Sequence, residues 1–283
     1  MGAATSACCS IDKIDDQKSV FVADGSQQNG QHSSSSSSGG GGAAFDPVRQ
    51  TGYTERRFAD GGVFQGYLQN GLKHGYGKYV YPDGVSVYEG QWKDDKCEGQ
   101  GKVKDEESEY EGQWAGDKKH GRGREVWFED KSVYVGEYLN GMKHGRGQYV
   151  WDDGSQYEGD FASDIIQGRG VYKSLKSTYE GTFHNSMQHG VGKQKWLDGR
   201  VYEGNFLENH RHGSGKMKWP DNHVYDGQWH RGQQHGEGLE GKPGQLLPVQ
   251  YKSGVRVAST VKTANLGAAR PAGPTATGAR VGA

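Results

Sequence analysis

Aromatic, glycine and acidic residues follow one recurring five-residue pattern between residues 64 and 229. An aromatic residue, an acidic or polar residue, a glycine, a polar residue and a second aromatic residue follow one another, as in Tyr88–Trp92. Side chains alternate between the two faces of a β-strand, so the two rings and the glycine share one face and the acid lies on the other. Successive copies begin at residues 64, 88, 110, 134, 157, 179, 202 and 225. The pattern therefore predicts one strand per copy, with a buried ring face and an acidic face in water.

Glycine-rich segments follow each of these strands. They have the form G-x-x-H-G-x-G, as in Gly71–Gly77 and Gly141–Gly147, and a second short segment with another ring then leads to an Asp-Gly pair such as Asp83-Gly84. Glycine adopts positive φ angles at no steric cost, which a tight reversal demands. We therefore expect each G-x-x-H-G-x-G segment to form the turn of a β-hairpin.

A single hairpin cannot bury its own rings, so each hairpin must stack on the next. We expect a ring of the neighbouring hairpin to lie in the gap above each strand glycine. The predicted fold is all-β, an elongated, twisted, single-layer sheet of stacked hairpins over residues 64–248, in which sixteen strands would extend about 75 Å. The predicted lattice residues are Tyr88, Gly90, Trp92, Tyr110, Gly112, Trp114, Tyr134, Tyr157, Tyr179, Tyr202, Tyr225 and Trp229.

The eight copies resemble the MORN (membrane occupation and recognition nexus) repeat, from residue 64 to about residue 245. Two copies depart from its pattern. The second has Glu98-Gly99 in place of His-Gly, followed by the acidic residues 105–107, and the fifth has Gln167-Gly168 and no Asp-Gly pair. We expect these two hairpins to be looser than the others and to kink the array.

The composition agrees with a thin repeat structure rather than a thick aliphatic core. Only 32% of the residues are hydrophobic, whereas the chain has 48 glycines, 7 Trp, 16 Tyr and 8 Phe, so rings must supply most of the buried area. The net charge of −1 disfavours nucleic acid as the main partner. There is no long apolar run for a membrane span and no secretory signal, and three cysteines fit a reducing cytosol, so we expect a protein that is not secreted.

The two ends of the chain lack the repeat. Residues 1–50 contain Ser33–Ser38 followed by Gly39–Gly42, residues 51–63 lead into the array, and residues 249–283 are rich in Ala, Gly, Thr and Pro, with basic but no acidic residues. These compositions predict a disordered arm with a flexible linker at the N-terminus and a disordered, weakly basic tail at the C-terminus.

The first six residues, Met1-Gly2-Ala3-Ala4-Thr5-Ser6, match an N-myristoylation motif with Gly2 as the acceptor. Cys8 and Cys9 follow at positions where palmitoylated cysteines commonly lie. One myristoyl chain gives only marginal membrane binding, so stable anchoring needs a second signal, and Asp12, Asp15 and Asp16 offset the nearby lysines. We therefore predict lipidation at Gly2, Cys8 and Cys9; the alternative is an unmodified arm with two exposed thiols.

Other candidate chemical sites are weak. Histidines recur at 74, 120, 144, 189, 212 and 235, but equivalent turns should lie about 9–10 Å apart, too far for shared metal ligation, so no metal is expected. The segment Gly236–Gly241 matches G-x-G-x-x-G without a βαβ context. The carboxylates Glu89, Glu111, Glu158, Glu180 and Glu203 form an exposed acidic ladder, and Cys97 fills space near a turn. We expect no catalytic residue and no cofactor.

Three functions remain open. The first is a membrane-tethered scaffold that recruits an unidentified protein partner on the cytoplasmic face of the plasma or flagellar membrane. The resemblance to MORN proteins implies such a role at membrane–cytoskeleton junctions, cilia or flagella. The second is direct binding of anionic phospholipid by a basic surface near the turns, made of Lys73, Lys118, Lys119, Arg122, Lys143, Arg146 and Arg211. The third is a regulatory arm that acts in trans on an enzyme, and two arrays could also pair as a homodimer through their exposed sheet edges.

Overall fold

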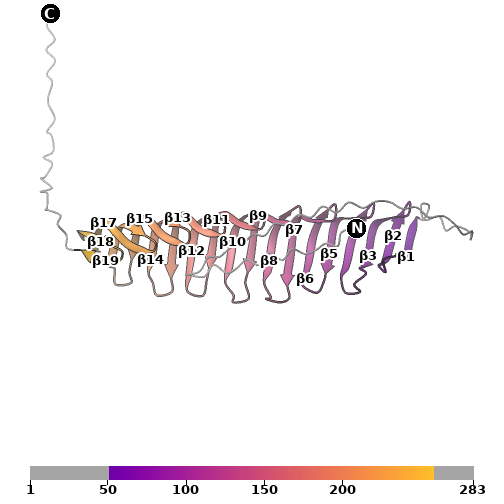
Figure 1. The fold of residues 1–283 in the computed structure, drawn as a ribbon, viewed down its shortest axis with the longest axis horizontal. Coiled ribbons are helices and arrows are strands. Elements are labelled where there is room, and N and C mark those ends of the chain that lie inside the picture. Colours follow the sequence, from indigo (N-terminus) through magenta and orange to yellow (C-terminus); the bar gives the residue numbers. More distant parts are fainter. Residues whose placement is uncertain (1–50, 258–283) are drawn as a thin grey trace, which may run out of the picture.

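The computed structural model describes residues 51–257, and these residues form one open antiparallel β-sheet of 19 strands. Each strand pairs with the strand that follows it in the chain, so β1 and β19 are the free edges of the sheet. Figure 1 shows the strands side by side in one elongated ribbon. The predicted all-β single sheet is confirmed, and none of the described residues forms a helix that could cross a membrane.

The eight repeats each contribute one hairpin. Their first strands carry the Y-E-G pattern and are β2 (Val63–Gln69), β4 (Val87–Lys93), β6 (Ser108–Ala115), β8 (Val133–Leu139), β10 (Gln156–Ala162), β12 (Ser177–His184), β14 (Val201–Leu207) and β16 (Val224–His230). Their second strands are β3 (Leu72–Val80), β5 (Lys96–Lys104), β7 (Lys118–Trp127), β9 (Met142–Val150), β11 (Ile165–Lys173), β13 (Met187–Trp196), β15 (His210–Lys218) and β17 (Gln233–Lys242).

The predicted position of the turns is wrong. Two residues close each hairpin, as at Asn70-Gly71, where φ is 53° and 78°. These two positive angles match the twist of a two-residue hairpin turn. The His-Gly pair lies inside the second strand instead, where Gly75 has φ of 68° and the pairing register of β2 and β3 shifts between Gly66 and Leu68. Gly75 therefore forms part of a β-bulge in β3 and not of the turn.

The sheet has two different long edges. The two-residue turns lie along one of them, which we call the tight-turn edge. The connections between repeats, which have three to six residues, lie along the other, the long-loop edge: residues 81–86, 105–107, 128–132, 151–155, 174–176, 197–200 and 219–223. The connections at residues 58–62 and 243–244, next to β1 and β18, lie along the same edge.

Strands also form outside the eight repeats. β1 (Gly52–Arg57) precedes the array, and β18 (Gln245–Lys252) and β19 (Val255–Val257) extend the sheet past residue 248, where the sequence placed the start of a disordered tail. Burial explains the extension, because Val249 is 2% exposed and the ring of Tyr251 packs 5.4 Å from that of Tyr225. β18 and β19 pack against the last repeat but do not carry the repeat pattern, so the pattern could not predict them.

The second and fifth hairpins are not looser than the others, contrary to expectation. Their second strands, β5 and β11, have 9 residues each, as many as β3 and β9. Each also pairs with the strands before and after it. Gly99 and Gly168 keep positive φ angles of 67° and 83°, so the bulge forms without the histidine.

The first tyrosine of each repeat forms the centre of the core. All seven of these tyrosines are 0% exposed: Tyr88, Tyr110, Tyr134, Tyr157, Tyr179, Tyr202 and Tyr225. The ring of Tyr110, for example, covers both glycines of its own hairpin, since a Cβ on Gly123 would come within 2.4 Å of the ring and one on Gly112 within 2.5 Å of the hydroxyl. The gap is thus filled by the tyrosine of the same repeat, not by a ring of the neighbouring hairpin as predicted.

Rings of adjacent repeats meet edge to face. The Tyr110 ring lies 5.3 Å from Trp114 in its own strand and 5.1 Å from Tyr138 in the next repeat, with interplanar angles of 87° and 83°. Such T-shaped contacts are favourable for aromatic quadrupoles. The pattern continues along the sheet, so every repeat is held to its neighbour by ring contacts as well as by backbone hydrogen bonds.

Candidate binding groove

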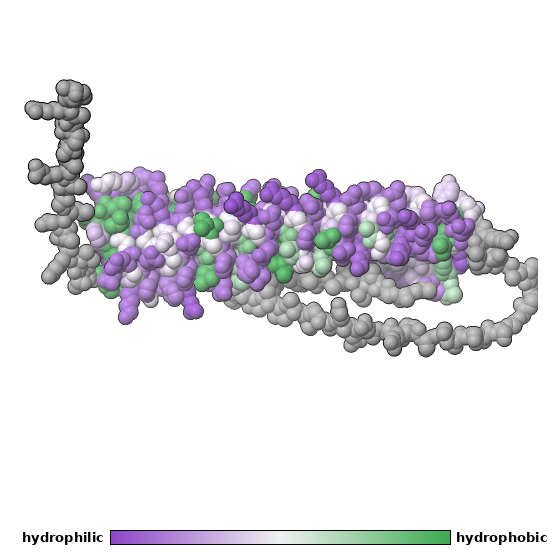
Figure 2. Space-filling model, turned by 90° about the horizontal axis from the view of Figure 1, so that it is seen from above, coloured by the Kyte–Doolittle hydropathy of each residue, from purple (hydrophilic) through white to green (hydrophobic). Residues whose placement is uncertain are grey.

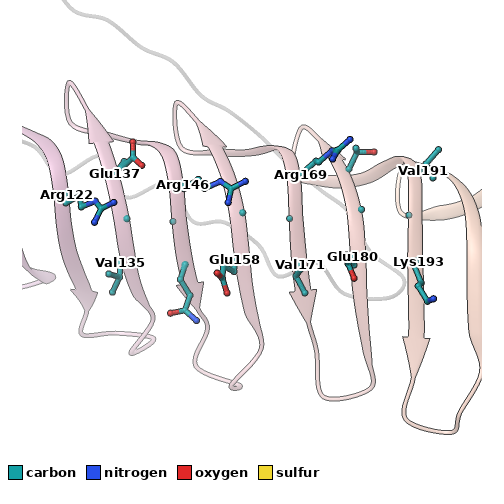
Figure 3. A pocket seen from close by; sticks show the side chains of 18 of the residues that line it. Arg122, Val135, Glu137, Arg146, Glu158, Arg169, Val171, Glu180, Val191 and Lys193 are labelled. Carbon is teal, nitrogen blue, oxygen red and sulfur yellow. The ribbon is translucent and has the colours of Figure 1, made fainter.

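A groove runs across the strands on the face opposite the tyrosine rings. It spans β7 to β14 and has a volume of about 1210 Å³. Its floor consists of glycines that pair directly across neighbouring strands, such as Gly136 with Gly147 and Gly159 with Gly170. Because these positions have no side chain on the open face or on the ring face, they form a depression along the middle of the sheet (Figure 3).

Two rows of side chains form the walls of the groove (Figure 3). The turn-side wall is nearer the tight-turn edge and contains Arg122, Glu137, Arg146, Arg169, Thr182 and Val191. The loop-side wall is nearer the long-loop edge and contains Val135, Gln148, Glu158, Val171, Glu180, Lys193 and Glu203. The register places these residues at regular intervals, because each comes from the position just before or just after a floor glycine.

In the second, third and fifth repeats, the polar residue after the Y-E-G glycine secures the bulge of its hairpin. The side-chain oxygen of Gln113 accepts a hydrogen bond from the backbone N–H of Arg122 at 2.8 Å, and Asp160 accepts one from Arg169 at 2.9 Å. These side chains lie over the positive-φ glycine of the His-Gly pair, where a Cβ on Gly121 would come within 1.8 Å of Gln113. This bond thereby fixes the backbone from which Arg122 and Arg169 project.

Two of the three arginines on this wall have no acidic partner among residues 51–257. Arg146 lies 3.4 Å from Asp160, whereas neither Arg122 nor Arg169 makes an ion pair in that range. On the opposite wall, Glu158 has Gln148 and Val171 as its cross-strand neighbours. The turn-side wall in the middle of the groove therefore carries the arginines, with Glu137 opposite Arg122 in the register, and the loop-side wall carries Glu158 between Gln148 and Val171.

The expected acidic ladder is mostly an alternation of acids and bases. Glu89 lies between Lys78 and Lys102 in the register, and Glu203 lies between Lys193 and Lys216. Lys193 and Glu203 form an ion pair, and Lys216 lies 3.5 Å from Asp226. The alternation is interrupted at Val135, Gln148 and Val171 in the middle of the sheet and at Gln65 and Leu239 near its ends. The bases come from the second strands of the hairpins, so the Y-E-G pattern alone did not reveal them.

The predicted basic surface is divided between the two faces. Four of these residues lie over the aromatic core and are buried or partly buried: Lys73, Lys119, Lys143 and Arg211. Lys143 is 5% exposed and its Nζ is 4.9 Å from the Trp127 ring, and burial lowers the pKa of Lys73, whose Nζ is 4.3 Å from Trp92. Arg122, Arg146 and Lys118 are exposed. The seven residues therefore do not form one surface.

The surface contains no single large apolar patch in the view from above. Figure 2 shows polar residues over most of that surface, with hydrophobic residues in small separate groups. Isolated apolar residues of this kind are normal on soluble proteins and do not by themselves mark a docking face. The groove is thus a more specific candidate for a binding site than the scattered apolar residues of the surface.

The other candidate chemical groups lie apart from the groove. The six repeat histidines are in strands, and no group of three His, Cys, Asp or Glu side chains within the described part of the chain could hold a metal ion. Cys97 is buried beside Tyr88 and Asp117, and burial raises the pKa of its thiol to about 12. The predicted lipidation residues, Gly2, Cys8 and Cys9, lie outside the described residues.

Sequence reasoning missed several groove residues, chiefly Val135, Val171 and Arg169. Their positions in the repeat are nevertheless regular. Arg169 lies between the two glycines of a G-x-G segment, Val171 follows that segment, and Val135 precedes the glycine of the Y-E-G pattern. The error was to assign the G-x-G segment to a turn. Once it lies in a strand, alternation of side chains places these residues on the open face.

Comparisons with known proteins agree with the repeat. A family model described as the MORN repeat matches residues 64–86, 88–104, 110–128, 134–156, 157–174, 179–199, 202–224 and 225–243. Among solved structures, a point mutant of the TCP10 domain of CPAP from Danio rerio is similar, with 14% sequence identity and a TM-score of 0.36 over 61% of this chain and 80% of that one. No curated protein matches the sequence.

Proposed function

The chain belongs to the MORN repeat family, and from that premise we propose that it is a non-catalytic, membrane-tethered scaffold whose groove binds an extended segment of a partner protein. The groove carries this proposal. It is open along its length and crosses β7 to β14, so it offers a track for a chain rather than an enclosed pocket for a small substrate.

The dimensions of the groove define the segment. Eight strands with seven spacings of roughly 4.8 Å give a track of about 34 Å, which an extended peptide of about ten residues would fill. Arg122, Arg146 and Arg169 lie on every second strand, about 10 Å apart, which is close to the length of three extended residues. The partner segment should therefore carry acidic residues at every third position, with apolar residues that contact Val135 and Val171.

Cross-linking tests the groove as a binding site. A photo-cross-linking side chain in place of Val171 should capture one discrete protein in cells, and the same group in place of Leu72 on the tight-turn edge should not. Adding Arg122→Glu and Arg169→Glu should abolish the capture, because both arginines face the groove and have no internal acidic partner. Equal labelling from the two positions, or labelling unaffected by the charge reversals, would contradict the proposal.

The membrane tether rests on the sequence motif at Gly2 and the adjacent cysteines. Gly2→Ala, and separately Cys8→Ser with Cys9→Ser, should move the protein from the membrane fraction to the soluble fraction, because stable anchoring takes two signals and each variant loses one of them. Intact protein and variants with Arg122→Glu and Arg169→Glu should both remain on the membrane.

If the Gly2 and cysteine variants stay on the membrane, the array itself attaches to lipid or to a membrane-bound partner. Binding to vesicles that contain anionic phospholipid would then favour the second candidate function, in which Arg122 and Arg169 hold phosphate groups. The location of the other basic residues over the aromatic core supports a protein partner instead. We place the role on the cytoplasmic face of a plasma or flagellar membrane, near the cytoskeleton. In-trans regulation of an enzyme is one form that such recruitment could take.

A further inference from the structure

Three tyrosines form a small exposed aromatic patch on the open face at the start of the array. Tyr53, Tyr67 and Tyr76 come from β1, β2 and β3 and are 70%, 53% and 57% exposed. The rings of Tyr53 and Tyr67 pack edge to face with their centroids 5.4 Å apart, and the Tyr76 hydroxyl donates a hydrogen bond to Glu89 at 2.9 Å. Adjoining exposed rings, unlike isolated apolar residues, indicate a surface that contacts an apolar side chain.

The aromatic patch and the groove lie in one line on the open face. Tyr76, Gln100, Arg122 and Arg146 each lie between the two glycines of a G-x-G segment, on β3, β5, β7 and β9. These strands pair glycine to glycine with their neighbours, so the four side chains occupy equivalent positions. Every second strand adds roughly 9–10 Å. The line therefore presents an aromatic ring, an amide and two guanidinium groups at even intervals.

The N-terminal segment of the chain carries a series with the same spacing. Four residues lie at every third position: Asp12, Asp15, Lys18 and Phe21. In a polyproline-II conformation three residues complete one turn and advance about 9.3 Å, so side chains at every third position form one row. The row of this segment would thus match the line of side chains on the sheet.

We propose that residues 12–21 bind to the open face of the same chain, from β9 to β3, and so fill one end of the groove; this inference rests on the groove of the proposed function. Asp12 then pairs with Arg146, and Asp15 pairs with Arg122, which has no acidic partner among residues 51–257. Carboxylate–guanidinium pairs of this kind form charge-assisted hydrogen bonds. A partner protein has to displace the segment before it can use this end of the groove.

Apolar contacts support the same register. Phe21 reaches the aromatic patch at Tyr76, and Ile14 lies level with β8, where Val135 is 48% exposed on the loop-side wall. Both contacts remove from water apolar surface that the sheet by itself leaves exposed, which favours binding. Lys13 belongs to a different row of the segment and points away from the arginines.

Charge and chain length exclude the other registers that pair the two aspartates with successive arginines. Two of these registers place Lys18 opposite Arg122 or Arg169, and like charges repel. The third runs in the opposite direction and places Phe21 at Ser214 on β15, fourteen strand spacings or roughly 67 Å from β1. A flexible chain as long as residues 22–50 has an rms length of only about 30 Å.

The proposed register needs a much shorter span. Tyr76 lies on β3, two strand spacings or roughly 10 Å from β1, so residues 22–50 connect the two points without strain. A flexible linker of this length gives the segment an effective concentration in the mM range beside its own sheet. The residues after 257 are a poorer occupant, because they carry Lys262, Arg270 and Arg280 and no acid.

Photo-cross-linking in the purified, unacylated full chain tests the contact. A cross-linking side chain in place of the exposed Gln100 should attach to residues 15–21, and one in place of Leu72 on the tight-turn edge should not. Mixing unlabelled and isotope-labelled copies distinguishes attachment within one chain from attachment between two chains. We expect attachment within one chain.

Charge exchange tests the register. Asp12→Lys with Asp15→Lys should reduce the attachment about tenfold, because two attractions become repulsions. Adding Arg122→Glu and Arg146→Glu should restore it. Asp24→Lys with Asp46→Lys makes the same change of net charge outside residues 12–21 and should leave the attachment unchanged.

A labelled peptide with the sequence of residues 10–23 measures how often the site is occupied. It should bind the chain with Asp12→Lys and Asp15→Lys about tenfold more tightly than the intact chain, because a site that is filled in nine molecules of ten is open in only about one of ten. Adding Arg122→Glu and Arg146→Glu should abolish this binding.

Three results would overturn the inference: no attachment from Gln100 to residues 15–21, attachment mainly between two copies, or equal affinity of the peptide for the two chains. Capture of a cellular protein from Val171 is independent of all three. That capture without attachment at Gln100 would leave the proposed function standing and refute this inference. Attachment at Gln100 without capture from Val171 would contradict the proposed function alone.

Discussion

At the scale of single residues, this chain depends on tyrosine and glycine acting together. Each first tyrosine lies over two glycines, one in its own strand and one in the next, and its hydroxyl donates a hydrogen bond to a backbone oxygen three residues ahead, as Tyr110 does to Gln113 at 2.8 Å. The ring fills the space that a Cβ would occupy, so the glycines are needed for space on the ring face and not only for backbone angles. The ring and the glycines are therefore one packing unit.

Replacing one floor glycine should be costly. Gly123→Ala would place a Cβ within 2.4 Å of the Tyr110 ring, so the ring must shift within a packed lattice. We expect a loss of about 1–3 kcal/mol in the free energy of unfolding, as for other overpacked cores. Urea denaturation measures it, with Gln148→Ala as the control, since that side chain is exposed in the same sheet. Equal stability of the two variants would show that the ring is not held as described.

The indole rings should differ in their contributions. Trp92 is 4% exposed and donates from Nε1 to the Gly77 oxygen at 3.0 Å, whereas Trp114 makes the equivalent bond to Gly101 but is only partly buried. Trp92→Ala should lower the free energy of unfolding by about 3–5 kcal/mol and Trp114→Ala by less. Thermal melting of Trp92→Ala, Trp114→Ala and, for comparison, Trp92→Phe would show which substitution lowers the stability more. A Trp114→Ala variant that melts at the same temperature as the intact chain would show that burial of this ring adds nothing.

At the scale of strands and hairpins, backbone geometry determines which residues face which side. The two-residue turn and the bulge at the His-Gly pair together set the register, so the residue between the glycines of G-x-G faces the groove and the lysine or arginine before His-Gly faces the rings. A shift of one residue would exchange the two faces. The second and fifth hairpins keep the same register because Gly99 and Gly168 supply the positive φ angle that the bulge needs.

The buried tyrosines make the hairpins sensitive to alkali. Desolvation raises the pKa of Tyr110, Tyr134, Tyr157 and Tyr179 above its usual value. The unfolded chain then loses phenolic protons from about pH 10, before the folded chain does, so stability is fully present below that pH and falls as pH rises above it. Absorbance at 295 nm should show these phenolates appearing together with loss of sheet circular dichroism. A smooth titration at pH 10 with the sheet intact would contradict the prediction.

At the scale of the whole molecule, each hairpin contacts only its neighbours in the sheet. Contacts join consecutive strands from β1 to β19, and no strand of the described part packs across the sheet from a distant repeat. In such an array, stability is close to a sum of repeat terms and nearest-neighbour terms. Loss of one end should therefore leave the rest folded.

A chain that ends after residue 223 tests this additivity. It lacks β16 to β19 and exposes the Tyr202 ring, which in the full chain packs 5.2 Å from Trp229. We expect the sheet circular dichroism per remaining repeat to be retained, with a smaller dependence of unfolding free energy on urea, because less surface is exposed on unfolding. Complete unfolding of the truncated chain would show long-range cooperativity that the nearest-neighbour picture does not contain.

The sequence by itself determined the repeat, its period and the class of fold, because alternation of rings, glycines and acids has a direct physical reading on a strand. It also identified the tyrosines that are fully buried. It placed the turns wrongly, because both the turn and the bulge need positive φ angles and glycine supplies either one.

Only the tertiary structure decided which cations face the rings and which face water, since Lys143 and Arg146 differ by three residues in the sequence and lie on opposite faces of the sheet. It also decided the alternation of charge across neighbouring strands and the groove between its two walls. Each of these depends on the register between neighbouring strands, and the pattern within one strand does not specify that register.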